Sequence, residues 1–186
     1  MCGIVGEFSM IENLIDQNEF MDLINLSVNR GPDSRGYFSD HKNFQFGFNR
    51  LIVLDKSEVA NQPIISKSGR FIMVYNGEVY NYLEIKKMLI SEGYQFSGTG
   101  DSEVIVNAFE AFGLIKTVDL LDGMFAIGLF DNNEKKLHLI RDFAGIKPLH
   151  FGVDGPTIIF ASQYDQIIKH PKFKNKSINQ NVLKLY

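Results

Sequence analysis

The stretch MCGIVGEF (Met1–Phe8) contains the only cysteine of the 186-residue chain, one peptide bond from its start. Chain ends usually fray and pack poorly unless other contacts hold them. A thiol at such a place is better suited to react than to fill space, although Cys2 could also be an incidental small residue in a half-buried strand. Position alone leaves both interpretations of Cys2 open.

Cys2 could supply both the nucleophile and the base of an acyl-transfer reaction. Methionine before a small residue is commonly removed after synthesis, which would give Cys2 a free α-amine beside its thiol. An unperturbed thiol has a pKa of about 8.5 and an α-amine one of about 7.7–8.0, so part of the amine is free base at neutral pH. It can then accept the thiol proton, directly or through one water. The four histidines offer no evident alternative base and form no metal-ligand pair: His41, His138, His150 and His170.

The composition is that of an ordinary soluble globular domain, with 45% hydrophobic residues, 22% charged residues and a formal net charge of -3. This balance gives no general attraction to nucleic acid or to an anionic membrane, which requires clustered Lys and Arg. One cysteine excludes an internal disulfide framework and a cysteine-rich zinc site, and it indicates a reducing compartment. The first ten residues form neither a signal peptide nor a transmembrane span. We therefore expect a cytoplasmic domain that acts on small molecules.

Hydrophobic patterning predicts strands, then helices, then strands again. Asn132-Asn133 and Asp154-Gly155 join two strand pairs as hairpin signals, which implies antiparallel pairing. Asn81, with Glu84 three residues on, is expected to cap one helix, and Asp101 another. Because strands and helices do not alternate strictly, the order predicts an α+β protein built in layers. The predicted strands are Gly3–Phe8, Phe44–Leu54, Phe71–Tyr75, Met124–Asp131, Lys136–Arg141, Leu149–Val153 and Thr157–Ala161, and the predicted helices are Glu19–Val28, Tyr82–Ile90 and Ser102–Phe112.

Seven further stretches are marked by Gly, Asn or charged residues. They are NRGPDSRG (29–36), RLIVLD (50–55), NQPI (61–64), YNGEVYNY (75–82), GDSEV (100–104), LLDGMFAIGLFD (120–131) and RDFAGIKPLHFG (141–152). Together with MCGIVG, and in this order, they resemble the glutaminase domain of class II glutamine amidotransferases. Each alone is a weak signal, whereas all of them in register over nearly the whole chain are specific. Glu78 and GDSEV favour the asparagine synthetase branch, while Asn29 departs from the histidine that the family often has there.

The resemblance implies an N-terminal nucleophile hydrolase fold, which is a four-layer α/β/β/α sandwich of two antiparallel sheets. It also implies hydrolysis of L-glutamine to glutamate and ammonia. Cys2 would attack the side-chain amide, ammonia would leave, and water would release glutamate from the thioester. The Asn76 side chain and the Gly77 N–H would face the oxygen of the tetrahedral intermediate, where charge develops. RGPD (30–33) would form a turn and border the glutamine pocket, whereas DGMFAIGLFD and RDFAGIKPL have no evident contact with substrate.

Free glutamine carries an α-carboxylate, an α-ammonium and an amide, so its site needs a cation, an anion and an oxyanion hole. By resemblance, Arg50 binds the α-carboxylate, for which a guanidinium fork is well shaped. Glu78 and Asp101 would bind the α-ammonium, with help from backbone carbonyls around Ile52 and Val53. Surface salt bridges or a helix cap are the alternative roles of the three charged residues, and Asp101 could both cap and bind. No metal is expected in this domain.

Residues 1–161 are predicted to form the glutaminase domain, and 162–186 the linker and the start of an ATP-dependent synthetase domain. FASQYDQIIKHP (160–171) and INQNVLKLY (178–186) resemble the crossover between these two domains. The synthetase domain would use ATP and Mg²⁺ to amidate aspartate or another acceptor with the ammonia, and a homodimer is a further expectation. The sequence leaves two alternatives open: a non-catalytic module of the same fold that senses glutamine or binds a partner, and a hydrolase of the same fold that acts on another amide.

Overall fold

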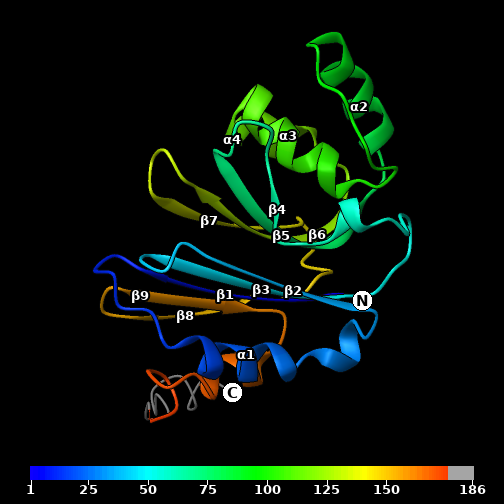
Figure 1. The fold of residues 1–186 in the computed structure, drawn as a ribbon. Helices are drawn as coiled ribbons and strands as arrows, with labels where there is room; N and C mark the ends of the chain where they lie inside the picture. The colour runs from blue at the N-terminus through cyan, green and yellow to red at the C-terminus, as the bar shows by residue number, and fades with distance from the viewer. Residues whose placement is uncertain (176–186) are drawn as a thin grey trace.

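Two antiparallel sheets lie face to face in the computed structural model, which describes residues 1–175 (Figure 1). The first sheet has the strand order β2-β3-β1-β9-β8 and the second the order β4-β5-β6-β7. The first comprises β1 (Gly3–Ser9), β2 (Ser34–Ser39), β3 (Phe44–Arg50), β8 (His150–Asp154) and β9 (Thr157–Ala161). The second comprises β4 (Ile64–Ile65), β5 (Phe71–Val79), β6 (Gly123–Asp131) and β7 (Lys136–Arg141).

Helices cover the outer face of each sheet, so the molecule has four layers (Figure 1). The second sheet is covered by α2 (Tyr82–Ser91), α3 (Ser102–Phe112) and α4 (Leu114–Leu120). The first is covered by α1 (Gln17–Asn25) and α5 (Tyr164–Ile168), and two short 3-10 helices, η1 (Val28–Arg30) and η2 (Glu58–Ala60), lie in connections. Among residues 1–175, no helix has the length and apolar character needed to cross a bilayer. The predicted α/β/β/α sandwich is confirmed.

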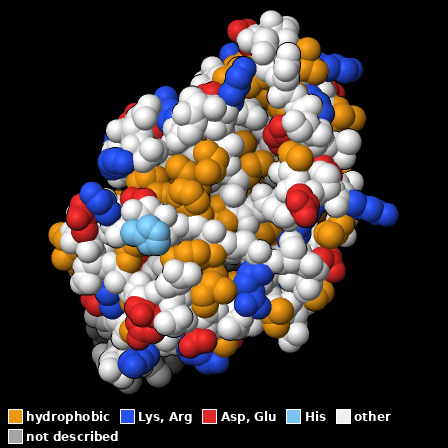
Figure 2. All heavy atoms as spheres, viewed as in Figure 1, with side chains coloured by type: hydrophobic (Ala, Val, Ile, Leu, Met, Phe, Trp, Pro, Cys, Tyr) orange, Lys and Arg blue, Asp and Glu red, His pale blue; other side chains and the backbone are white. Residues whose placement is uncertain are grey.

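The core between the sheets is built mainly from phenylalanine. Every second residue of β3 contributes one, at Phe44, Phe46 and Phe48, because alternate side chains of a strand point to the same face. Phe130 of β6 stacks on Phe44 with ring centroids 3.9 Å apart, and Phe160 of β9 meets Phe46 edge to face. On the face shown in Figure 2, hydrophobic side chains gather at the level where Figure 1 shows the two sheets meeting. This core fixes the two sheets against each other.

Strand boundaries differ from the prediction where tertiary pairing decides them. The predicted strand Phe71–Tyr75 continues as β5 to Val79, because β5 pairs with β6 along its whole length. Asn76 and Gly77 therefore lie within a strand. The predicted strand Phe44–Leu54 ends at Arg50 as β3, and its partner β2 was not predicted, because this edge strand is polar and lacks an apolar run.

Asn81 and Asp101 occupy the predicted N-cap positions of α2 and α3, but neither makes a side-chain capping hydrogen bond, so the predicted capping by their side chains is wrong. The Asn81 amide donates to the carbonyl of Leu120 at 2.8 Å, and its oxygen accepts from the backbone N–H of Asp122 at 3.1 Å. The Asp101 carboxylate accepts from the hydroxyl of Tyr75 at 2.6 Å. Both side chains thus join segments that are distant in sequence and leave the helix starts to backbone contacts.

The chain after β9 packs on the outer face of the first sheet. Gln166 of α5 is buried and donates to the carbonyl of Leu23 in α1 at 2.9 Å. His170 is fully buried, and Phe173 joins the cluster between this sheet and its helices. Part of the predicted linker therefore packs on the first sheet, and the division after Ala161 stays a prediction. The remainder of the predicted linker, residues 176–186, lies outside the described residues.

Candidate active site

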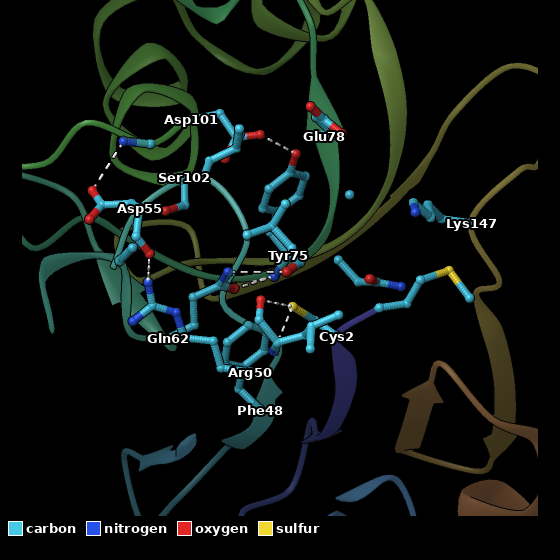
Figure 3. A pocket seen from close by; sticks show the side chains of 18 of the residues that line it. Cys2, Phe48, Arg50, Asp55, Gln62, Tyr75, Glu78, Asp101, Ser102 and Lys147 are labelled. Atoms are coloured by element: carbon cyan, nitrogen blue, oxygen red, sulfur yellow. Dashed lines mark hydrogen bonds between the residues drawn. The ribbon is translucent and has the colours of Figure 1, made fainter. Parts of the chain in front are cut away.

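A cavity of about 250 Å³ opens where the start of β1 meets the ends of β3 and β5 (Figure 3). The facing of the two sheets brings these strand ends together. Most of the predicted site residues line this one cavity: Cys2, Arg50, Val53, Asn76, Gly77, Glu78 and Asp101. Its wall also includes residues that the sequence analysis did not select, among them Met1, Asp55, Gln62, Tyr75, Met124 and Lys147.

The Cys2 thiol is half-buried against the backbone of Leu51. Its sulfur lies 3.7 Å from the carbonyl oxygen of Leu51, to which it donates, and 3.4 Å from the backbone nitrogen of Leu51, from which it accepts. Burial raises the pKa of the thiol, and the Leu51 hydrogen bond, the chain amine and the charges of Arg50 and Lys147 oppose that rise without cancelling it. The thiol is therefore protonated at neutral pH, and an attack on substrate needs a base.

Asn76 presents a buried amide group with no internal partner. Its side chain is 2% exposed, and its Nδ2 has no hydrogen-bond acceptor among residues 1–175. An unsatisfied buried donor costs about 1–3 kcal/mol, so a donor of this kind needs a reason to be kept. Its place in the wall of the Cys2 cavity makes it available to a ligand oxygen.

Gly77 is required by the sheet itself. A Cβ at this position would lie 2.3 Å from the carbonyl oxygen of Met124 and 2.7 Å from the Cα of Phe125, both on β6. Any side chain would separate β5 from β6 beside Asn76. The close backbone approach that the sequence predicted at Gly77 is made to the neighbouring strand β6. The role of the Gly77 N–H in the oxyanion hole stays a prediction.

Arg50 is a buried cation that is partly committed to the following segment. Its guanidinium donates to the carbonyl of Ser57 and to Oδ1 of Asn61, both at 2.8 Å, and to the carbonyl of Asp55. A guanidinium has five N–H groups, so these three bonds leave two for a ligand. Arg50 therefore shapes the segment after β3 and still presents positive charge in the cavity wall.

Asp55 ties the segment after β3 to the loop before α3. Its carboxylate accepts from the backbone N–H groups of Ser57 at 2.7 Å, Thr99 at 2.7 Å and Gly100 at 3.1 Å. Hydrogen bonds from Ser57, Thr99 and Gly100 hold the pKa of this carboxyl well below its usual range. The charged carboxylate thus holds together two segments that contribute to the cavity wall.

Two carboxyl groups, those of Asp101 and Glu78, line the same cavity. Asp101 accepts from the Tyr75 hydroxyl at 2.6 Å and from the backbone N–H of Val79 at 3.0 Å. Burial raises the pKa of Asp101, and the negative charge of Glu78 adds to this rise, while the two hydrogen bonds oppose it. A cation bound between two carboxylates relieves their repulsion, so this wall suits an ammonium group.

A family model described as a glutamine amidotransferase domain matches residues 1–186. The chain belongs to this family. The amidotransferase chain is 36% identical over 166 residues to asparagine synthetase [glutamine-hydrolyzing] 1 of Bacillus subtilis (strain 168). This alignment covers 88% of this chain and 26% of that protein. It is 37% identical over 174 residues to asparagine synthetase [glutamine-hydrolyzing] 2 of the same organism, covering 92% of this chain and 23% of that one. The chain thus spans about a quarter of the length of these relatives.

A solved structure of the glutamine phosphoribosylpyrophosphate amidotransferase from B. subtilis, complexed with ADP and GMP, has a similar fold. It aligns with a TM-score of 0.70 and 18% sequence identity, over 89% of this chain and 43% of that one. This likeness confirms the predicted N-terminal nucleophile hydrolase fold for the amidotransferase domain.

Two expectations from the sequence need revision in the amidotransferase domain. RDFAGIKPL and DGMFAIGLFD do reach the cavity, because Lys147 and Met124 line it. Ile52 does not line it, and its backbone N–H donates to Asp33 of RGPD at 2.7 Å. RGPD therefore supports the segment after β3 through Asp33, while the role given to Ile52 stays a prediction.

Tyr75 and Lys147 lie in the family stretches YNGEVYNY and RDFAGIKPLHFG, but nothing in these stretches marks them as lining residues, because the cavity forms only where distant elements meet. Among the described residues, no group of three or more His, Cys, Asp or Glu side chains is placed to hold a metal ion.

Proposed function

We propose that this domain hydrolyses L-glutamine to glutamate and ammonia through a thioester at Cys2. The observation that carries the proposal is the buried, unpartnered Nδ2 of Asn76 in the cavity that also holds the thiol. An amide donor aimed into such a site can bind an oxygen more strongly as that oxygen becomes negative. Its position within β5 keeps it fixed before substrate arrives.

The charged residues of the cavity match the remaining groups of glutamine. The two free N–H groups of Arg50 would bind the α-carboxylate, and Glu78 and Asp101 would bind the α-ammonium. Val53 lies in the same wall, where its backbone carbonyl would assist. Glutamine held at both ends in this way presents its side-chain amide to Cys2.

The proposed proton transfers use the α-amine that Cys2 would carry after removal of Met1. After removal of Met1, the α-amine of Cys2 takes the thiol proton as the C–S bond to the amide carbon forms, and the carbonyl oxygen becomes negative. The amine returns that proton to the leaving nitrogen when the C–N bond breaks, which releases ammonia. It then takes a proton from water, whose oxygen attacks the thioester carbon. When the C–S bond breaks to give glutamate, the amine returns this proton to the leaving sulfur, which restores the Cys2 thiol and the free amine.

The comparison with longer relatives supports a wider proposal. In a full-length protein of the asparagine synthetase type, the ammonia would pass to a C-terminal domain that uses ATP and Mg²⁺ to amidate aspartate or another carboxylate. That domain, L-glutamine and a second copy in a homodimer are the proposed partners, and the cytoplasm is the proposed compartment. We expect the hydrolytic step to need neither nucleotide nor metal.

Product release tests the proposal directly. The chain beginning at Cys2 is incubated with L-glutamine in the presence of EDTA and without nucleotide, and glutamate and ammonia are both measured. We expect equal release of the two products, abolished in Cys2→Ala. Binding of glutamine by calorimetry without any release would favour the non-catalytic alternative. A strict requirement for ATP or metal would contradict the proposed chemistry.

A further inference from the structure

The loop between β7 and β8 holds Lys147 in the cavity wall through a rigid backbone clamp. The Asp142 carboxylate accepts from the backbone N–H groups of Ile146 at 2.7 Å and of Lys147 at 2.9 Å. From the other side, the Arg141 guanidinium donates to the carbonyls of Lys147 at 2.8 Å and of Gly145 at 2.6 Å. Both polar groups of the Lys147 backbone are thus fixed, so its side chain leaves the loop in a defined direction.

Lys147 is a mostly buried residue whose ammonium is unpaired within residues 1–175. The residue is only 7% exposed, although lysine is rarely buried without a partner. Among residues 1–175, no hydrogen-bond or ion-pair partner meets its ammonium, in contrast to Lys86, which donates to the carbonyl of Gly98, and Lys172, which pairs with Glu7. Because Lys147 lines the cavity and its ammonium has no partner among the described residues, that ammonium is available to negative charge that arises in the cavity.

Lys147 lies on a different side of the cavity from the carboxylates that are already hydrogen-bonded. In Figure 3 it stands across the view from Asp55 and Asp101. The charged and ionisable groups around the cavity are the chain amine, Cys2, Arg50, Asp55, Tyr75, Glu78, Asp101 and Lys147, with Arg30 donating to the carbonyl of Cys2 from η1. Among them, Asp55 and Asp101 are satisfied by internal donors, and no ion pair joins Lys147 to Glu78.

We propose that Lys147 is a positioning residue for the nucleophile: its ammonium supplies positive charge that stabilises the thiolate of Cys2. It acts through Cys2, whereas the α-carboxylate of glutamine is bound by Arg50. The electrostatic effect of Lys147 has the direction that this role requires, because its charge lowers the pKa of the Cys2 thiol while burial raises it. This assignment rests on the proposed function, and it is tested by a measurement that needs no glutamine.

The test is the rate of alkylation of Cys2 by iodoacetamide as a function of pH, in the chain beginning at Cys2. The thiolate sulfur forms the S–C bond and iodide leaves, so the rate reports the thiolate fraction. Cys2 is the only thiol in the sequence, so the signal has one source. In Lys147→Met, alkylation at pH 7 should fall about threefold or more, since a nearby opposite charge has been removed. Lys147→Arg should restore most of the rate.

A matched control is Lys136→Met, which removes an exposed lysine of β7 paired with Glu134 and should leave alkylation unchanged. With glutamine as substrate, Lys147→Met should lower kcat and leave KM nearly constant. Lys147→Gln provides a second neutral variant if the methionine variant does not fold.

Three results would overturn the assignment: unchanged alkylation in both neutral variants, a rise in KM alone, or no rescue by arginine. An unchanged alkylation rate would reject the role of Lys147 whether or not glutamine is hydrolysed. Slower alkylation with no glutamate released by the unsubstituted chain would instead reject the proposed function and leave the charge effect in place.

Discussion

Replacing Asn76 by alanine should reduce turnover strongly and cost little stability. The Asn76 side chain is 2% exposed and its Nδ2 has no acceptor among the described residues, so the substitution breaks no internal hydrogen bond of that donor. It removes a desolvated donor whose burial opposes folding. In the proposed reaction the same donor meets the negative oxygen of the tetrahedral intermediate.

The expected size of each effect follows from these contacts. Loss of one oxyanion donor typically lowers kcat by about 10²–10³, which corresponds to roughly 2.7–4 kcal/mol of transition-state stabilisation. The matched control is Asn49→Ala on β3, where an equally buried asparagine donates to the carbonyl of Ile24 at 2.6 Å and to Oγ of Ser27 at 2.9 Å. Removing these bonds should cost about 1–3 kcal/mol of stability. In a chain of this size, each kcal/mol of lost stability lowers Tm by about 2–4 °C.

Steady-state kinetics with glutamine and thermal unfolding of both variants form the assay. Asn76→Ala should keep its Tm close to that of the unsubstituted chain and lose kcat, whereas Asn49→Ala should lose Tm and keep kcat. A change in KM alone in Asn76→Ala would refute the oxyanion role. A large fall in its Tm would refute the argument that the donor is unsatisfied in the free protein.

Three further substitutions test other parts of the site. Cys2→Ala should abolish hydrolysis while calorimetry still detects glutamine binding, and measurable turnover would exclude the thioester. Gly77→Ala should lower Tm by forcing β5 from β6, at a cost of about 1–3 kcal/mol for overpacking; an unchanged Tm would contradict the close approach. The pKa of Asp55 is lower in the folded chain than in the unfolded chain, where it is about 3.9, so the charged carboxylate stabilises the fold at pH values above about 3.9. This stabilisation is lost as the pH falls through the pKa of the folded state. Thermal melts of Asp55→Asn should thus show lower Tm at neutral pH and a shallower decline below about pH 4, and an equally steep decline would argue against this clamp.

The sequence predicted the features that depend on local patterns. The alternation of Phe44, Phe46 and Phe48 predicted a strand with one buried face, and the structure buries all three between the sheets. Asp154-Gly155 predicted a hairpin, and Gly155 has the positive φ of 56° that such a turn needs. The order of the family stretches also predicted the sandwich fold.

Tertiary structure alone decided how the polar side chains are used. Asn81 and Asp101 stand at helix starts and fit capping patterns, yet their side chains bond Leu120 and Tyr75, because distant polar groups in a folded interior compete with local backbone donors. Burial depends on neighbours from the whole chain, so the sequence could not show that Asn76 is left without an acceptor.

The sequence by itself determined most of the longer strands, the two hairpins, the family and the chemistry expected of an early cysteine, since these follow from periodicity, turn residues and residue type. Only the folded structure decided that Lys147 from the loop after β7 shares a cavity with Cys2. It also decided that Arg50 bonds the carbonyl of Asp55, while the Asp55 carboxylate bonds Gly100 in the loop before α3. The physical reason is distance: electrostatic and packing interactions act through space, and the spatial neighbours of a residue are fixed only when the two sheets close on each other.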